Sequence, residues 1–177
     1  LDQITTENLI KSAYLYVHLG LPFNELMKKL KTTLKANMKE LPTQISSSDA
    51  AAAALITSSV FSEKEEDRDT IINGLGNLFL NNSLKIEELD WQGFAFLYRV
   101  YSQSKYLNQS LIDRLNTELI KKSERDLIDF ENGSIILSVL ASAEKKEYST
   151  VSSIIDMIHW QLSKEGTSMF RQFDGRN

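Results

Sequence analysis

Cysteine is absent from this 177-residue chain, and glycine, proline and histidine are scarce, with seven, two and two residues. Without cysteine the chain has no disulfide framework, no thiol nucleophile and no cysteine-ligated zinc or iron–sulfur site. So few glycines and prolines disfavour loop-rich β architectures and low-complexity linkers. The length fits one compact domain or a short repeat array rather than two full-sized domains.

Long apolar runs are also missing. The longest, Ala50–Ile56, is mostly alanine and falls well short of the roughly 18 residues that a membrane span needs. Lysine and arginine number 20 against 24 acidic residues, so the net charge is −4, and nothing attracts the chain as a whole to nucleic acid or to an anionic membrane. The sequence starts at Leu1, which indicates a processed or truncated start from which any targeting peptide has gone.

Apolar residues recur at spacings of three and four nearly everywhere, which is typical of amphipathic helices. Four anchor leucines lie 40, 42 and 40 residues apart, namely Leu15, Leu55, Leu97 and Leu137. They define four predicted repeats of two helices each, at about 5–44, 45–88, 89–128 and 129–165, before a C-terminal tail at 166–177. Because an isolated helical hairpin cannot bury its apolar faces, stacked hairpins must share them. The predicted fold is therefore all-α, a right-handed α-solenoid of four helical hairpins in one domain over residues 1–165. A single globular helical bundle is the alternative.

Side chains able to cap a helix stand near the start of each predicted pair, at Thr6, Ser48, Asp90 and Asp129. The segment 73–77 contains Gly74 and Gly76 without the third glycine or the preceding strand of a dinucleotide-binding loop. We expect these two glycines to allow close helix packing beside the alanine-rich segment 50–54.

Three segments resemble the degenerate helical repeats of organellar proteins, the heptatricopeptide and octotricopeptide groups that are related to pentatricopeptide repeats. They are Asn8–Tyr16, Trp91–Tyr101 and Asp129–Leu140. The resemblance lies in the repeat length of about 40 residues, a first helix rich in leucine and tyrosine, and a second helix of the form Leu-x3-Leu-x3-Leu. Armadillo and HEAT repeats have a similar length. The resemblance implies a mitochondrial or chloroplast role in RNA processing, RNA editing or ribosome-associated complexes. Such proteins are usually basic and this chain is not, which favours a scaffold within an RNA-handling assembly.

The sequence contains no nucleophile elbow, Walker loop, zinc-protease motif or pair of catalytic carboxylates. His18 has no acidic residue one helical turn away that would suggest a triad or a metal motif. His159 follows Asp156 by three residues on one helical face, a pair that can titrate near neutral pH but is more commonly a surface ion pair or a partly buried histidine. We therefore expect no enzymatic activity, no cofactor, no metal site and no small-molecule substrate.

Four lysines of the first repeat, Lys28, Lys31, Lys35 and Lys39, follow helical spacing and are predicted to project from one face. Such a row fits a phosphate backbone or an acidic partner, or it merely solvates an outer helix face. In the third repeat, Tyr98, Arg99 and Lys105 are candidates for stacking bases and holding phosphates, although rings at this spacing also pack in cores.

Two further groups are candidates for docking partner proteins. One is the acidic run of the second repeat, represented by Glu63, Glu65, Glu66 and Asp67, which also suits the start of a helix. The other is the apolar set of the C-terminal tail, Met169, Phe170 and Phe173.

Two function hypotheses follow. The first is a non-catalytic subunit of a mitochondrial RNA-processing, RNA-editing or ribosome-associated complex, which binds proteins and, as an open alternative, contacts RNA directly. The second is a protein-only scaffold or adaptor of a multiprotein complex without nucleic acid.

Overall fold

The computed structural model describes residues 4–21, 24–61, 66–103, 105–123 and 130–142, together with positions 152, 155 and 156. Within these residues the elements are helical throughout. They are α1 (Thr6–His18), α2 (Asn24–Asn37), the single turn α3 (Leu41–Gln44), α4 (Ser47–Val60), α5 (Glu66–Leu80), the 3-10 turn η1 (Ile86–Glu88), α6 (Trp91–Tyr101), α7 (Gln109–Ser123) and α8 (Phe130–Ser142). The expectation of an all-α protein is confirmed.

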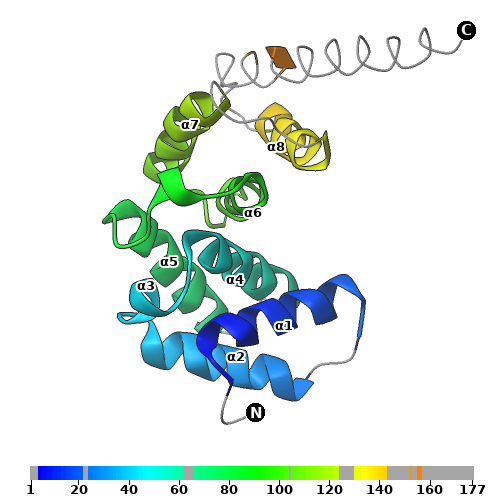
Figure 1. Ribbon diagram of the computed structural model, residues 1–177, viewed down its shortest axis with the longest axis vertical. Helices are drawn as coiled ribbons and strands as arrows, with labels where there is room; N and C mark the ends of the chain where they lie inside the picture. Colours follow the sequence, from blue (N-terminus) through cyan, green and yellow to red (C-terminus); the bar gives the residue numbers. More distant parts are fainter. Residues whose placement is uncertain are drawn as a thin grey trace, which may run out of the picture.

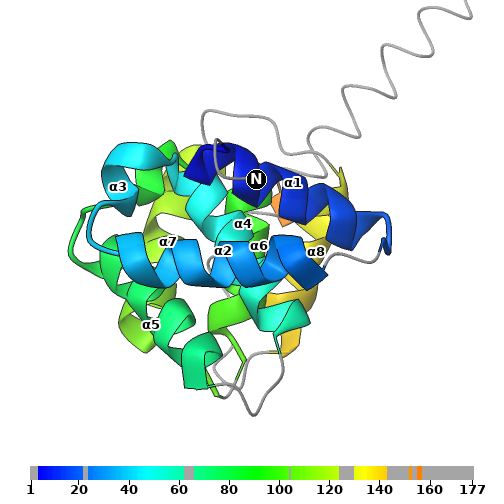
Figure 2. The same ribbon diagram turned by 90° about the horizontal axis from the view of Figure 1, so that it is seen from below.

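The helices lie in two rows that follow the order of the chain (Figure 1). In one row α1 packs on α4, α4 on α6 and α6 on α8, while in the other α2 packs on α5 and α5 on α7. Within each hairpin, α1 contacts α2, α4 contacts α5 and α6 contacts α7. Figure 2 views the molecule from the end where α2 lies in front. Of the helix expected to follow α8, only positions 152, 155 and 156 are described, and all three are helical.

Three helices of the first row begin at a side chain that accepts a hydrogen bond from the backbone. Thr5 caps α1, and Asp90 caps α6 by accepting from the Gly93 N–H at 2.6 Å. Ser46 caps α4 in a capping box, in which the Asp49 carboxylate in turn accepts from the Ser46 N–H. These bonds satisfy N–H groups that have no partner inside the helix.

Asp90 is therefore the cap that the sequence predicted, whereas the other two described caps lie one or two residues earlier than expected. Thr6 and Ser48 instead make long-range bonds, since the Thr6 hydroxyl donates to Gln44 at 2.7 Å and the Ser48 hydroxyl accepts from the Asp90 N–H at 3.2 Å. The fourth predicted cap, Asp129, lies outside the described residues.

Helix α4 is the centre of the first row, and it contacts α1, α5, α6 and η1. Four of its alanines are completely buried, namely Ala50, Ala51, Ala53 and Ala54. Because an alanine side chain is a single methyl group, other helices can approach α4 closely on several sides.

The side chains nearest to the two glycines of α5 are not these alanines but Met38 and Tyr101, while α5 as a whole packs against α4. A Cβ atom at Gly74 would lie 2.9 Å from the terminal methyl of Met38, and one at Gly76 would lie 2.9 Å from the ring of Tyr101. The Tyr101 hydroxyl donates to the Ile72 carbonyl at 2.6 Å. Gly76 thus makes room for a buried tyrosine of the next hairpin.

Two arginines join the ends of helices to later elements. Arg68 of α5 donates to the Ser58 carbonyl near the end of α4 at 2.7 Å. Arg114 of α7 donates to the carbonyls of Phe79 and Leu80, at the end of α5, at 2.8 Å each. A cation at a helix C-terminus complements both the free carbonyls and the helix dipole. These side chains therefore tie the end of α4 to α5 and the end of α5 to α7.

Candidate functional site

The lysine row of α2 turns toward the next hairpin. Lys35 hydrogen-bonds the Asp67 carboxylate, and the Lys31 amine lies 3.7 Å from its second oxygen. The hydrogen bond from Lys35 and the charges of both lysines hold the pKa of Asp67 below its ordinary value, although partial burial opposes this. Two members of the row therefore act within the molecule, as a link between α2 and α5.

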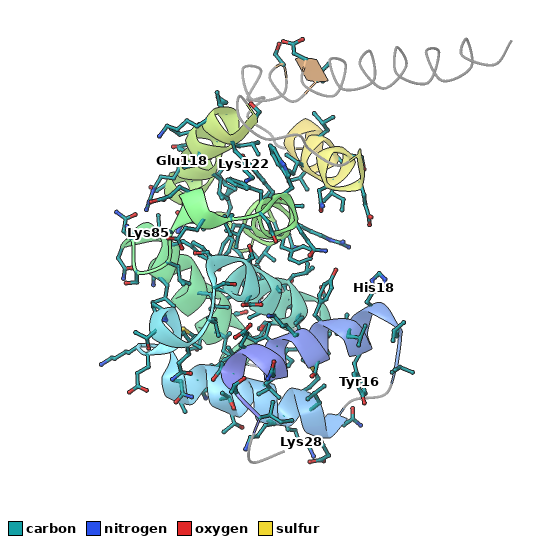
Figure 3. All side chains as sticks on the ribbon, in the orientation of Figure 1. Tyr16, His18, Lys28, Lys85, Glu118 and Lys122 are labelled. Atoms are coloured by element: carbon teal, nitrogen blue, oxygen red, sulfur yellow. The ribbon has the colours of Figure 1, made fainter. Side chains whose placement is uncertain are left out.

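The other two members lie at the ends of the row. Lys28 pairs with Glu25 of its own helix at 3.0 Å and projects at the end of the molecule where α2 lies (Figure 3). Lys39 is exposed in the turn that follows α2. The four amines therefore do not form an uninterrupted track for phosphates.

The acidic run makes a second link between hairpins, through Asp69 of α5. Its carboxylate accepts from the Tyr106 hydroxyl at 2.7 Å and from Lys105 at 3.0 Å. These two hydrogen bonds lower the pKa of Asp69, and the bond to Asp69 raises the pKa of Lys105. Burial, and then the bond to Asp69, raises the pKa of Tyr106. Lys105 thus acts within the molecule rather than as a free phosphate contact.

Of the predicted acidic docking residues, Glu66 is exposed at the first position of α5 and Asp67 faces the lysines of α2. Glu63 and Glu65 lie outside the described residues. So do the three tail residues, Met169, Phe170 and Phe173.

The predicted base-stacking residue Tyr98 is completely buried, and its hydroxyl donates to Asn116 of α7 at 2.6 Å. This corrects its assignment as an RNA contact, because a ring inside the core offers no face to a base. Arg99, by contrast, is exposed on α6. Its carbonyl accepts from the Gln103 side chain at 2.9 Å.

The structure brings together a cluster that sequence reasoning missed, the Tyr14 cluster, formed by Tyr14, His18, Gln92 and Phe96. The Tyr14 ring lies 5.5 Å from that of Phe96 and 6.2 Å from that of His18, centroid to centroid. The Gln92 amide donates to the Tyr14 hydroxyl at 3.2 Å. Figure 3 shows His18 and Tyr16 on opposite sides of α1, with His18 directed away from α2. The cluster therefore joins the first hairpin to the third, across the helix between them.

The repeat register explains this contact. Tyr14 immediately precedes the first anchor leucine and Phe96 immediately precedes the third, so both occupy the same position of the repeat. The residue at this position in α4 is Ala54, whose methyl group is buried. A small side chain in the middle repeat leaves room for the two large rings to meet above it. The alternation of a ring, an alanine and a ring before the first three anchors is the signal in the sequence for the contact between Tyr14 and Phe96, but not for His18 or Gln92.

The cluster combines the half-buried ring of Tyr14 with exposed polar groups and a nearby carboxylate, while the Phe96 ring is buried. Burial raises the pKa of Tyr14, and the charge of Glu131, an exposed residue in the first turn of α8, raises it further. Tyr14 therefore stays protonated at neutral pH and can both donate and accept hydrogen bonds. With His18 and Gln92 exposed beside it, the arrangement suits recognition by stacking and hydrogen bonding.

No helix among the described residues has both the length and the apolar character needed to cross a bilayer. The same part of the chain brings no three metal-ligating side chains together. No family model, no curated protein and no solved structure matches this chain.

Proposed function

We propose that this chain is a non-catalytic α-solenoid scaffold that recognises a segment of a partner protein at the Tyr14 cluster. The observation that supports this proposal most strongly is the internal use of the charged motifs. Asp67 and Asp69 engage three of the lysines that sequence alone offered to RNA. Binding of nucleic acid depends on cations that remain available to phosphates.

The α-solenoid form is part of this proposal. It is supported by the two rows of helices, in which the described hairpins pack on their neighbours in chain order. In such an architecture a ligand contacts side chains from several repeats at once. The Tyr14 cluster has this property, because its members come from α1 and α6.

The resemblance to organellar repeats supports a place in a mitochondrial RNA-handling assembly, with protein contacts as the means of recruitment. An acidic scaffold fits that role without binding RNA itself, since the net charge is −4.

The test is affinity purification from the native source, with half of each sample treated with nuclease before washing. The bait is the wild-type chain, a His18→Ala/Gln92→Ala variant, or a Lys28→Glu variant as the control. We expect a fixed set of proteins that survives nuclease, is depleted by the cluster variant and is retained by the control. Loss of the set on nuclease treatment, or depletion by Lys28→Glu with a steep salt dependence, would contradict the proposal in favour of RNA.

A further inference from the structure

Helix α6 is buried on nearly every side, and Gln92 and Arg99 are the two of its residues that are exposed. They lie seven positions apart, which is about two turns, so both project from one face of the helix, about 10 Å apart along its axis. Phe96 lies between them on this face, and its ring contacts that of Tyr14. The exposed face of α6 is therefore continuous with the Tyr14 cluster and extends beyond it to Arg99.

The guanidinium of Arg99 is available to an external anion. Within the described part of the chain no carboxylate pairs with it, and the side-chain hydrogen bond at this residue is the one that its backbone carbonyl accepts from Gln103. Lys105, in the turn that follows the same helix, is by contrast paired with Asp69. Because a guanidinium donates two parallel hydrogen bonds to a carboxylate, Arg99 is suited to an acidic side chain of a partner.

A charge of the opposite sign lies at the other end of this face. Glu131 is exposed in the first turn of α8, a helix that packs on α6. Burial raises the pKa of Tyr14 and the charge of Glu131 raises it further, so this carboxylate lies near the phenol that Gln92 binds. Among the described residues Glu131 forms no ion pair, and its backbone carbonyl accepts from the Ser134 hydroxyl. An anion beside the Tyr14 hydroxyl and a cation two turns along α6 thus flank the cluster.

Charges of both signs on one face select against a ligand of a single sign. The backbone of a nucleic acid is uniformly negative, so Arg99 attracts it but Glu131 repels it. A protein segment with one basic and one acidic side chain complements both residues. Complementary charges also fix the position and direction of a partner on the surface. Charge complementarity therefore favours a protein segment of this kind.

The polar groups of the cluster favour an extended segment over a helix. A helical partner docks through an apolar face, whereas Phe96 is exposed by only 8 % and Tyr14 is half-buried. The side-chain amide of Gln92 has a carbonyl oxygen and a second N–H that suit the donors and acceptors of a peptide backbone. In a polyproline II conformation, side chains three residues apart share one face and lie about 9 Å apart. This distance matches the spacing of the two charges along α6.

We infer that the partner segment is an extended peptide with a basic and an acidic side chain three residues apart, the basic one paired with Glu131 and the acidic one with Arg99. The inference rests on the function proposed for the Tyr14 cluster and names the chemistry of its partner. Between the two charges, the backbone of the segment crosses the Tyr14 cluster and forms hydrogen bonds with Gln92. Arg99 and Glu131 set which segments bind, because each accepts only one sign of charge.

Selection from a phage-displayed library of random peptides on the immobilised wild-type chain tests the inference. We expect the enriched peptides to carry a basic and an acidic residue three positions apart. Selection on Glu131→Gln should lose the preference for the basic residue alone, and selection on Arg99→Gln the preference for the acidic residue alone. Glu66→Gln and Lys39→Gln, which remove exposed charges elsewhere on the chain, are the matched controls and should keep both preferences.

A synthetic peptide of the enriched sequence then measures the two contacts one at a time. By fluorescence anisotropy at low salt, we expect Glu131→Gln and Arg99→Gln each to weaken binding about two- to fivefold, since exposed ion pairs are weak. An exchange of charges is the sharper comparison. Arg99→Glu should bind the original peptide less tightly than it binds a peptide whose acidic residue is replaced by lysine.

The His18→Ala/Gln92→Ala variant separates this inference from the function proposed for the Tyr14 cluster. Peptides that this variant no longer binds, but that show no preference for either charge or keep both preferences in Glu131→Gln and Arg99→Gln, would overturn the inference and leave the proposed function standing. Peptides that bind this variant as tightly as the wild type, or a selection that enriches no peptide, would overturn both. Retention of the wild-type circular dichroism spectrum shows that each variant is folded.

Discussion

The ring of Tyr14 packs against the ring of Phe96, with their centroids 5.5 Å apart, although the two residues belong to the first and third hairpins. Ala54 lies at the equivalent position of the hairpin between them. The contact makes the first and third hairpins part of one surface. It also means that this surface depends on the stacking of all three hairpins, and not on any single helix.

Substitution Tyr14→Ala should lower the free energy of unfolding by about 1–2 kcal/mol, because it removes an aromatic contact and a hydrogen-bonded hydroxyl. Urea unfolding measures this change. Tyr16→Ala is the matched control, since Tyr16 is an exposed residue of the same helix. Its effect should stay within about 0.5 kcal/mol. Equal losses in the two variants would show that the contact with Phe96 contributes nothing.

The buried hydrogen bond between Tyr98 and Asn116 predicts a second change in the free energy of unfolding. Tyr98→Phe leaves the Asn116 side chain without its 2.6 Å partner, and we expect a loss of about 1–3 kcal/mol in the free energy of unfolding. The double variant Tyr98→Phe/Asn116→Leu should be more stable than the sum of the two single changes implies, because no buried polar group is left unpaired. Strict additivity would contradict this account of the pair.

The two glycines of α5 offer a matched comparison. Alanine favours a helix over glycine by about 1 kcal/mol. At Gly76 the new methyl group would meet the buried ring of Tyr101, and overpacking costs about 1–3 kcal/mol. At Gly74 it would meet the flexible end of Met38. Gly74→Ala should therefore be neutral or stabilising and Gly76→Ala destabilising, as judged by thermal unfolding. The reverse order would contradict the packing described for Tyr101.

The contacts of Asp69 with Lys105 and Tyr106 predict that the free energy of unfolding depends on pH. Its pKa is lowered in the folded protein from an ordinary value of 3.8, so the folded state favours the ionised carboxylate. The stability that this provides is fully present above the ordinary pKa and is lost as the pH falls through the lowered one. The partners Tyr106 and Lys105 keep their protonation states over this acidic range.

Asp69→Asn should therefore unfold at a lower urea concentration than the wild type at neutral pH, and the difference should shrink toward about pH 3. Glu66→Gln is the control, because Glu66 is exposed beside the same run. An Asp69→Asn deficit that is constant over this range would show that the charge of Asp69 is not what links α5 to the next hairpin.

The positions of the helices were predictable from the sequence, because a periodicity of 3.6 residues is a local property of each segment. The burial of Tyr98 was not, since α6 is apolar on nearly every side and only its contacts with α4, α7 and α8 decide which rings are covered. The partners of Lys31 and Lys35 were likewise hidden. Their meeting with Asp67 depends on how α2 packs against α5, which spacing along one helix does not specify.

The charged motifs raise the central question, whether they link hairpins or serve an external ligand. A double-mutant cycle between Lys35 and Asp67 answers it most directly, using Lys35→Met, Asp67→Asn and the double variant in urea unfolding at low and high salt. We predict a favourable coupling free energy between the two residues that decreases as salt screens the pair. Strictly additive changes, with no coupling at low salt, would show that Lys35 and Asp67 do not link the hairpins. The lysine row would then be favoured as a binding site for an acidic ligand.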